Sequence, residues 1–495
     1  MSSSYRQIFK STSIIGGGAV IGGLLHLAQN KIIAVLLGTS GMALFGTFSS
    51  LAGMISNLTG FGLGSSAVRF IAEADGKRDR KAIAEIIFSY RRAVWGTGLL
   101  GMAVLAGGAW FFSLLTFKTS GYMWMIVALS PWVLLTAIYS GQCALLQGLH
   151  RIVGLSALRI WGVFVALLVS GPCFWLMREQ GIVPCLVLTA AILAGGAWLL
   201  VRRVELEPVP RPAWKRQLEI LKPMFRLGIA FMVINLIGGV CAYAQNAILI
   251  RNIGQEGCGL YLAGYALAGI FVNFVLNAMG TDYYPKLVNL LIDRPALNRA
   301  INEQMDISLL LVLPGVLVSL VFAPLIIRLL YSDAFVPAVI LMRLFCFGIL
   351  IRVFAWSLAY VLMAQGEGKI LMSAEAVSGA CGLVFFCVGL HLGGLNGAAI
   401  SFMLNYCCYS LLLVGILHFR YRLHVAPGIW GGFGAALGIL AAVFIFVEWA
   451  SNWWILWGGG CFFCMVLSFG CARLLLRKLQ ITPEKLLQKV LHARK

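Results

Sequence analysis

Long apolar runs, separated by short polar connections, follow one another along the whole chain. About eighteen consecutive apolar residues can cross a bilayer as a helix, and we count fourteen such runs. They lie near 12–37, 42–65, 93–115, 122–146, 152–177, 181–201, 225–250, 259–284, 305–330, 338–363, 370–391, 395–418, 427–447 and 453–476. Arg178 and Glu179 mark the turn between the fifth and the sixth. The runs lack the alternation of barrel strands, so the pattern predicts an all-α polytopic membrane protein.

Composition agrees with this fold class. The chain is 60% hydrophobic and 11% charged, with a mean hydropathy of +0.91, which is far from the composition of a soluble domain. The first apolar run is too long for a cleavable signal peptide, so we expect it to be the first spanning helix. The 13 cysteines fall almost entirely within apolar runs and lack zinc-site spacing, so no disulfide and no metal is assigned.

An internal repeat divides the chain. One fixed offset maps Ala28-Gln29-Asn30 on Ala244-Gln245-Asn246 and Gly38 on Gly254. In all, 14 of the 43 positions from 22 to 64 are identical at this offset. A chain of this composition would give roughly four or five by chance. Internal repeats of apolar segments build many secondary transporters, with the substrate site between the halves.

The repeat unit holds six helices, and an even number returns the chain to the same side of the membrane. The two halves are therefore expected to be parallel repeats, related by an axis along the membrane normal. The predicted organisation is an N-terminal six-helix lobe at 1–201, a cytoplasmic linker at 202–222, a C-terminal six-helix lobe at 223–418, an extra helix pair at 419–476 and a basic amphipathic tail at 477–495. The tail is expected to lie on the inner leaflet.

Basic residues fix the predicted orientation. With both termini placed in the cytoplasm, 30 of the 38 Lys and Arg residues fall on the cytoplasmic side and only 4 on the opposite side. This is a strong positive-inside signal. The net charge of +20 is thus mainly a topology signal, and a nucleic-acid partner is not expected because no soluble domain presents a basic face.

Several segments resemble a known family. The stretch from Leu37-Gly38-Thr39 through Gly46, with Gly60–Gly64 and the segment 67–73, is similar to the first helical hairpin of bacterial O-antigen and lipid III translocases. The segments 257–287, 364–369 and 394–399 are similar to the matching parts of the second half. These translocases belong to the multidrug/oligosaccharidyl-lipid/polysaccharide exporter superfamily. The resemblance covers about 10–420.

The resemblance implies flipping of an undecaprenyl-diphosphate-linked oligosaccharide, an O-antigen or related surface-polysaccharide unit, from the inner to the outer leaflet of a bacterial inner membrane. Other membrane proteins of polysaccharide assembly would be further partners. Twelve helices are usual in this family, so the last two are a departure that resembles the extra pair of lipid II flippases.

Such a substrate needs a basic cavity for its diphosphate. Intramembrane cations cost about 2.5–3.5 kcal/mol each on insertion scales, so they usually face the interior and mark a pathway. Lys31 follows Gln29-Asn30, and snorkelling to an interface is its alternative. Arg69 could instead pair with Glu73 at i,i+4 spacing. The predicted substrate-binding cations are Lys31, Arg69, Arg92, Arg159, Arg343 and Arg352.

Arg343 and Arg352 lie nine residues apart and so do not share one helix face, which places at most one of them centrally. The other could pair with Glu375 or lie near an interface.

Uncharged polar residues and two carboxylates complete the predicted site. The polar cavity is predicted to include Gln29, Asn30, Gln245, Asn246 and Asn273, with helix–helix hydrogen bonding as the alternative. Glu375 and Asp306 could bind H⁺ or Na⁺ and couple an ion gradient to flipping, whereas an interfacial position is the alternative for Asp306. No other cofactor and no catalytic residue is expected.

Two rival functions remain. A multidrug/cation antiporter of the same superfamily would need an anionic cavity, whereas the predicted one is cationic. A membrane-embedded glycan polymerase or glycosyltransferase would need a long outer loop, but the outer connections span only a few residues, such as 38–41 and 251–258. No phosphate-binding loop of an ATP-driven transporter is present in the sequence.

The parallel repeat also predicts a mechanism. Two similar rigid lobes would rock between inward-open and outward-open states without covalent chemistry. The matching turns at 38–41 and 254–257 hold glycines that permit close approach, so we expect them to close the outer side of the cavity.

Overall fold

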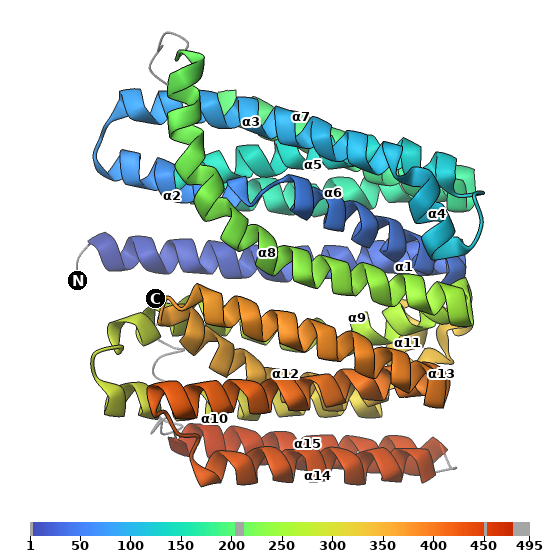
Figure 1. Ribbon diagram of the computed structural model, residues 1–495. Coiled ribbons are helices and arrows are strands. Elements are labelled where there is room, and N and C mark those ends of the chain that lie inside the picture. Colours follow the sequence, from blue (N-terminus) through green and yellow to red (C-terminus); the bar gives the residue numbers. More distant parts are fainter. Residues whose placement is uncertain (1–2, 203–211, 450–452, 479–495) are drawn as a thin grey trace. The chain divides into compact units, whose positions relative to one another are not determined.

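A computed structural model describes residues 3–202, 212–449 and 453–478, and every regular element in these ranges is helical (Figure 1). The predicted all-α class is confirmed. The described residues up to 253 form α1 (Ser3–Thr59), α2 (Leu63–Gly76), α3 (Arg80–Gly107), α4 (Ala109–Phe117), α5 (Met123–Gly148), α6 (Ile152–Met177), η1 (Arg178–Gly181), α7 (Ile182–Arg202) and α8 (Trp214–Ile253). Those from 255 on form α9 (Gln255–Asn289), α10 (Arg294–Val321), α11 (Ala323–Leu330), η2 (Asp333–Phe335), α12 (Ala338–Ala364), α13 (Gly368–Tyr421), α14 (Pro427–Trp449) and α15 (Trp453–Lys478).

The chain is a multi-pass membrane protein. Within the described residues, 10 helices are long and apolar enough to span a membrane, or 11 if the bent pair α3 and α4 forms one span. Three of these run for 38, 50 and 54 residues, far beyond the roughly 20 that one crossing needs. Each contains a break, at Gly38, at η1 and at Gly393-Gly394 respectively. The expected total of fourteen crossings stays a prediction.

Helix ends recur between the halves in step with the sequence repeat. Gly38 and Gly254 both have positive φ, 71° and 95°, and each lies at a turn between two helical segments. The next elements correspond at a slightly shorter offset. Asp79 caps α3 and Asp293 caps α10, and each carboxylate accepts a hydrogen bond from the backbone amide three residues later. The repeat therefore continues beyond the 43 positions, 22 to 64, that the sequence comparison identified.

One feature breaks this correspondence. In the first half, α1 ends at Thr59 and α2 begins at Leu63 after a turn, whereas α9 runs unbroken to Asn289 through the equivalent positions. The turn residues Phe61 and Gly62 have φ values of 48° and 61°. The first half carries three glycines in Gly60–Gly64 where the second half has only Gly280, so only the first has the freedom to turn here.

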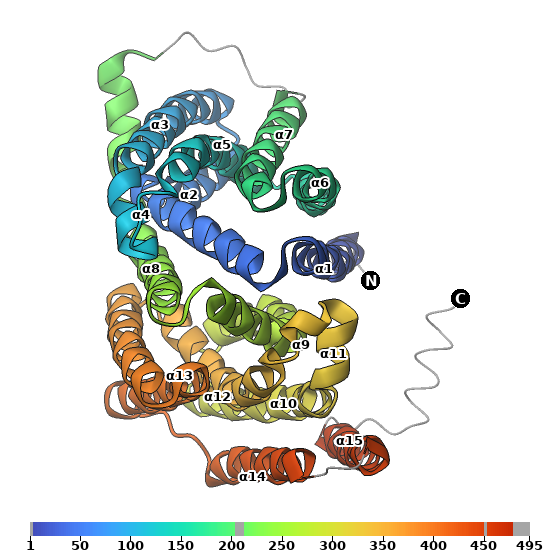
Figure 2. The same ribbon diagram turned by 90° about the vertical axis from the view of Figure 1, so that its right-hand side faces the viewer.

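The chain forms two compact units. Unit 1 holds residues 1–262 with 330–334, and unit 2 holds 263–329 with 335–495. In unit 1, α5 lies between α3 and α7, as the end-on view shows (Figure 2). The expected linker 202–222 lies partly outside the described residues, as does the amphipathic tail 477–495, described only to Lys478. The division into two six-helix lobes, at 1–201 and 223–418, stays a prediction.

Two ion pairs fasten the C-terminal helix pair within unit 2. Arg343 on α12 is buried and donates from one terminal nitrogen to Glu448 of α14 over 2.6 Å, while its Nε donates to the Leu320 carbonyl. Lys478 at the end of α15 pairs with Asp306 of α10. A buried charge is costly without a partner, so the Arg343–Glu448 pair holds α14 against α12, whereas the exposed Lys478–Asp306 pair contributes less.

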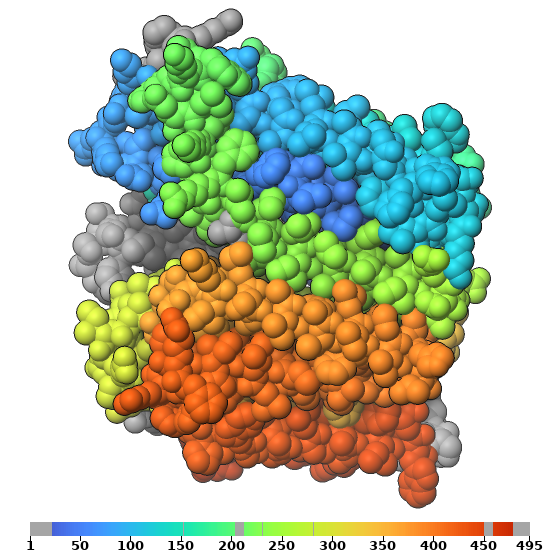
Figure 3. All heavy atoms as spheres, in the orientation of Figure 1, coloured from blue at the N-terminus to red at the C-terminus, as the bar shows by residue number. Residues whose placement is uncertain are grey.

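The outer surface of α3 is apolar, as a bilayer-facing helix requires. Trp95, Leu99, Leu100 and Val104 are all exposed on it. Side chains of α3 form a continuous part of the surface drawn in light blue in Figure 3. Exposed apolar side chains of this size on a long helix are stable in lipid and would aggregate in water.

Candidate functional site

A polar pocket of about 180 Å³ lies in unit 1 beside the break between α1 and α2. Five helices contribute to its wall: the end of α1, the start of α2, and the middle of α3, α5 and α8. The polar side chains that line it are Ser56, Asn57, Ser65, Tyr90, Thr97, Ser140 and Asn235. Among the described residues, its lining holds no carboxylate and no cationic group.

The break in the chain builds this pocket. Gly62 adopts a left-handed conformation, and a Cβ there would lie 2.0 Å from the Gly228 carbonyl oxygen. A Cβ on Gly228 would in turn lie 2.3 Å from the Phe61 carbonyl oxygen. The α1–α2 turn and α8 thus touch backbone to backbone, which only two glycines permit. This contact brings Asn57 and Asn235 to the same pocket.

Hydroxyl and amide groups can bind a neutral polar ligand such as a sugar. The Asn235 amide nitrogen donates to the Phe231 carbonyl at 2.9 Å, so its amide oxygen can still act as an acceptor. The hydroxyls of Ser65 and Ser140 can both donate and accept, and the Thr97 hydroxyl, which donates to the Val94 carbonyl at 3.3 Å, can accept. In a membrane-spanning bundle, such a concentration of hydrogen-bonding groups marks either helix contacts or a polar ligand site.

Four of the predicted polar residues lie in unit 1, on α1 and α8. Gln29 is buried and Asn30 is half-buried, as is Gln245. Asn246 donates to the Ser50 hydroxyl at 3.1 Å, so it joins α8 to α1 within unit 1. This is a hydrogen bond between two helices, which is the alternative role that the sequence offered for Asn246. None of these residues lines the polar pocket.

The predicted cations of unit 1 are spread over four helices. Lys31 on α1 and Arg159 on α6 are exposed. Arg92 on α3 stacks over the ring of Trp214 at 5.0 Å.

Arg69 on α2 is exposed. Its suggested partner Glu73 instead accepts a hydrogen bond from Lys77 at 2.8 Å. That bond holds the pKa of the Glu73 carboxyl below its usual range, with a smaller contribution from the Arg69 charge. Arg69 is thus not the residue that binds this carboxylate directly.

Unit 2 brings Arg352 and Glu375 toward one tyrosine cluster. The Tyr409 hydroxyl donates to Glu375 Oε1 at 2.5 Å, joining the two halves of α13. Arg352 on α12 and Glu375 both act electrostatically on Tyr406, which lies one turn before Tyr409. Arg343 does not join this cluster, because it binds Glu448. Asn273 is exposed on α9, and Asp306 is paired with Lys478.

The repeat offset pairs Asn57 with Asn273, but the sequence did not predict the pocket around Asn57. Ser65, Thr97, Ser140 and Asn235 stand alone in apolar runs, where hydroxyls and amides also glue helices together. The available signal was the glycine cluster at 60–64, which has no full counterpart in the second half. A departure from an internal repeat can mark the place where the halves have different roles.

The structure is thus a bundle of membrane helices with a transporter-like feature. Five helices place hydrogen-bonding groups around a pocket beside the break between α1 and α2. The chain belongs to the polysaccharide biosynthesis protein family, whose profile matches residues 8–291. A comparison with curated proteins gives no match.

Solved structures share the fold. An inward-facing multidrug resistance MATE family transporter of the MOP superfamily is 16% identical, with a TM-score of 0.71, covering 81% of this chain and 94% of that chain. A MOP superfamily transporter from Pyrococcus furiosus is 17% identical, with a TM-score of 0.62 and coverages of 84% and 95%. The lipid II flippase MurJ, in an inward closed conformation, is 13% identical, with a TM-score of 0.66 and coverages of 94% and 99%.

The extents of these matches bear on the last helices. The MurJ match covers 94% of the 495 residues of this chain, so the part left out is shorter than the 23 residues of α14 and the 26 residues of α15 taken together. At least part of the C-terminal helix pair is therefore included in that match. At these identities the similarities establish the fold, and the related families are transporters and flippases.

Proposed function

We propose that this protein flips an undecaprenyl-diphosphate-linked oligosaccharide from the cytoplasmic to the periplasmic leaflet of a bacterial inner membrane by alternating access. Membership of a polysaccharide biosynthesis family and the fold shared with a lipid II flippase support this function. The observation that carries it is the pocket of hydroxyl and amide groups in unit 1, which suits a glycan. Both termini are proposed to be cytoplasmic, because the basic residues gather on that side.

The same pocket argues against the cation antiporter. An organic cation is held by carboxylates or aromatic faces. The described lining of this pocket holds no carboxylate, and its only aromatic residue is Tyr90. A glycan polymerase is the more distant rival, since the related families are transporters and flippases. A flipping assay in liposomes with defined lipid-linked oligosaccharides distinguishes all three functions, because only a flippase exposes the unchanged glycan on the opposite leaflet.

Asn57→Ala should slow flipping about fivefold while the protein inserts normally. The substitution removes an amide from the pocket, and one hydrogen bond to a sugar hydroxyl is worth about 1 kcal/mol. Asn289→Ala is the matched control, because Asn289 is exposed at the end of α9 and outside the pocket. Equal flipping rates for Asn57→Ala and wild type would remove Asn57 from the glycan site.

Lys31→Ala should reduce glycan export several-fold with near-normal protein abundance, and Lys31→Arg should be tolerated better. Lys31 is exposed on α1. Its ammonium group, or the guanidinium of Lys31→Arg, can bind the substrate diphosphate once the diphosphate has left bulk water. Coulomb attraction is less screened there. The measurement is surface glycan in a deletion strain at low expression. Full surface glycan with Lys31→Ala would show that Lys31 is not a substrate contact.

Glu375 is the proposed coupling carboxylate, because Asp306 is already neutralised by Lys478. In Glu375→Gln, the amide oxygen can still accept a hydrogen bond from the Tyr409 hydroxyl. The neutral amide cannot take up a proton, and it has no negative charge to attract Na⁺. We therefore expect flipping by this variant to be insensitive to an imposed H⁺ or Na⁺ gradient, whereas Asp306→Asn stays sensitive. The liposome assay with and without each gradient measures this. Retained gradient sensitivity in Glu375→Gln would eliminate Glu375 as the coupling group.

A further inference from the structure

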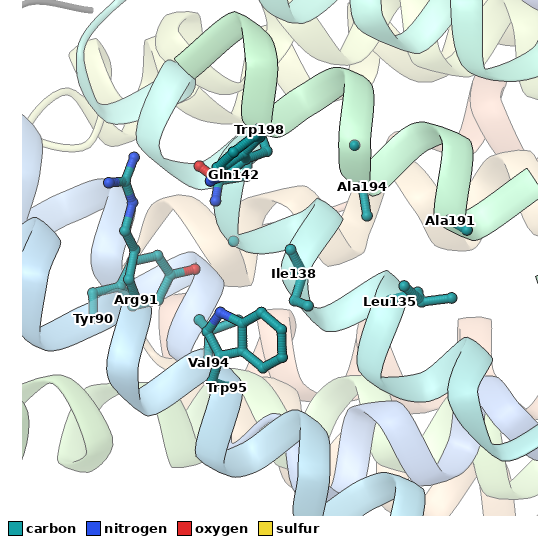
Figure 4. A pocket seen from close by; sticks show the side chains of 12 residues that line it. Tyr90, Arg91, Val94, Trp95, Leu135, Ile138, Gln142, Ala191, Ala194 and Trp198 are labelled. Carbon is teal, nitrogen blue, oxygen red and sulfur yellow. The ribbon is translucent and has the colours of Figure 1, made fainter. Parts of the chain in front are cut away.

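A second cavity, of about 340 Å³, lies on the outer side of the helix layer formed by α3, α5 and α7 (Figure 4). Both α3 and α7 pack along α5 but have no extended contact with each other, so a groove runs between them with α5 as its floor. Small residues open this groove, because Gly141, Ala191, Ala194 and Gly195 line it. Its flanks are apolar and exposed, with Leu99 on α3 and Ile192 on α7, as expected for a groove that opens to lipid.

Polarity changes along the groove. Figure 4 shows Tyr90 and Arg91 at one end, and Leu135 and Ala191 at the other. The polar end is the one near the helix terminus at Arg202, since Trp198 lies one turn before it. The apolar end lies deeper along the helices. A polar end near the helix termini and an apolar channel behind it match the head and the acyl chain of a membrane lipid.

Two polar atoms at this end are buried without a hydrogen-bond partner among the described residues. They are the Nε of Arg91, a donor, and the Oε1 of Gln142, an acceptor. A buried donor and a buried acceptor left unpaired are each costly, and so such groups usually mark a bound molecule or ion. An occupant that brings an acceptor for Arg91 and a donor for Gln142 would satisfy both atoms.

Charge selects the occupant further. Arg202 stacks on the ring of Trp198, with 3.9 Å between the guanidinium carbon and the ring centroid, which places a second cation beside the groove. No acidic residue belongs to the described lining. Trp95 and Trp198 are exposed large aromatics of the kind that lie at lipid headgroup level.

We propose that this groove binds one anionic phospholipid with a hydroxylated headgroup, of the phosphatidylglycerol type, from the leaflet on the side of Arg202. Its phosphate accepts from Arg91, its headgroup hydroxyl donates to Gln142, and an acyl chain lies over Ala191 and Leu135. The groove adjoins the polar pocket, with which it shares Tyr90, Val94 and Gly141 as a common wall, and the proposal does not depend on the transported substrate. Bound lipid would brace α3 and α7 along the groove, where both pack on α5.

Native mass spectrometry of the full-length protein tests the site with two probes that share their acyl chains. We expect one phosphatidylglycerol to be retained about tenfold better than phosphatidylcholine, which has the phosphate but no donor and no net charge. Arg91→Gln and Gly195→Leu should each lower retention of phosphatidylglycerol about tenfold. The first removes the cation, and the second fills the groove, since Gly195 lines it and Gly196 does not.

Matched controls keep the test decisive. Lys81→Gln removes a cation from the exposed start of α3, and Gly196→Leu adds the same side chain one residue along α7, where a Cβ, as at Gly195, meets nothing within 4 Å. Both should retain phosphatidylglycerol as wild type does. Equal retention of the two lipids, or equal losses in test and control variants, would overturn the proposal. Displacement of the lipid by millimolar inorganic phosphate would overturn the lipid assignment. Displacement by an equimolar polyprenyl phosphate would assign the groove to the transported substrate instead.

Discussion

A disulfide between cysteines introduced at Ser40 and Glu256 should reduce glycan export at least about tenfold, and its reduction should restore export. The turns that hold these residues meet within unit 1, because a Cβ on Gly259 would lie only 1.9 Å from the Thr39 carbonyl oxygen. If the lobes rock, this contact on the proposed outer side must open for the substrate to leave. A covalent link across it would hold the protein closed on that side.

Neighbouring contacts support this closed side. The α4–α5 segment is tied to the α8–α9 turn by the Gln255 amide, which donates to the Tyr122 hydroxyl at 2.7 Å. The Lys118 ammonium donates to the Arg251 carbonyl at 3.0 Å. These bonds, like the Thr39–Gly259 contact, would have to break in an outward-open state.

The crosslinking experiment needs a background without the native thiol at Cys258, which lies two residues from Glu256. Each single cysteine variant is a control, since Ser40→Cys also loses the hydrogen bond to Glu179. Formation of the disulfide is followed by a mobility shift, and export by surface glycan. Normal export from a protein shown to be fully crosslinked would rule out this gate.

Gly62→Ala should destabilise the protein by about 3 kcal/mol and abolish flipping by the fraction that still inserts. Gly62 has a φ of 61°, which costs any residue with a Cβ about 1–2 kcal/mol. Its Cβ would also lie 2.0 Å from the Gly228 carbonyl oxygen, so α8 would have to move away. That movement would separate Asn235 from Asn57 and open the wall of the pocket.

Gly53→Ala provides the comparison for Gly62→Ala. Gly53 lies in α1, the helix that precedes the turn at Gly62, and a Cβ there meets no atom within 4 Å. This variant should melt at or slightly above the wild-type temperature in detergent, because alanine favours the helix. Wild-type melting and flipping by Gly62→Ala would show that the α1–α2 turn does not fix the pocket.

The sequence by itself determined the fold class and much of the internal symmetry. Apolar runs of spanning length leave helices as the available structure in a bilayer, and this rule is local. The turn at Arg178 and Glu179 was predicted and lies at η1. The sequence repeat pairs Gly38 with Gly254, and both have a positive φ in the structure. Backbone preference at a glycine is also local, which is why such positions can be read from the chain.

The tertiary structure alone decided what the polar residues meet. Arg343 binds Glu448 over a separation of 105 residues, and Asp306 binds Lys478 over 172. Asn235 and Asn57 meet in one pocket because two glycines let α8 touch the α1–α2 turn. A charge or an amide in an apolar run specifies only that it needs a partner. Which partner it finds depends on helix packing, and packing is set by side chains far apart in the sequence.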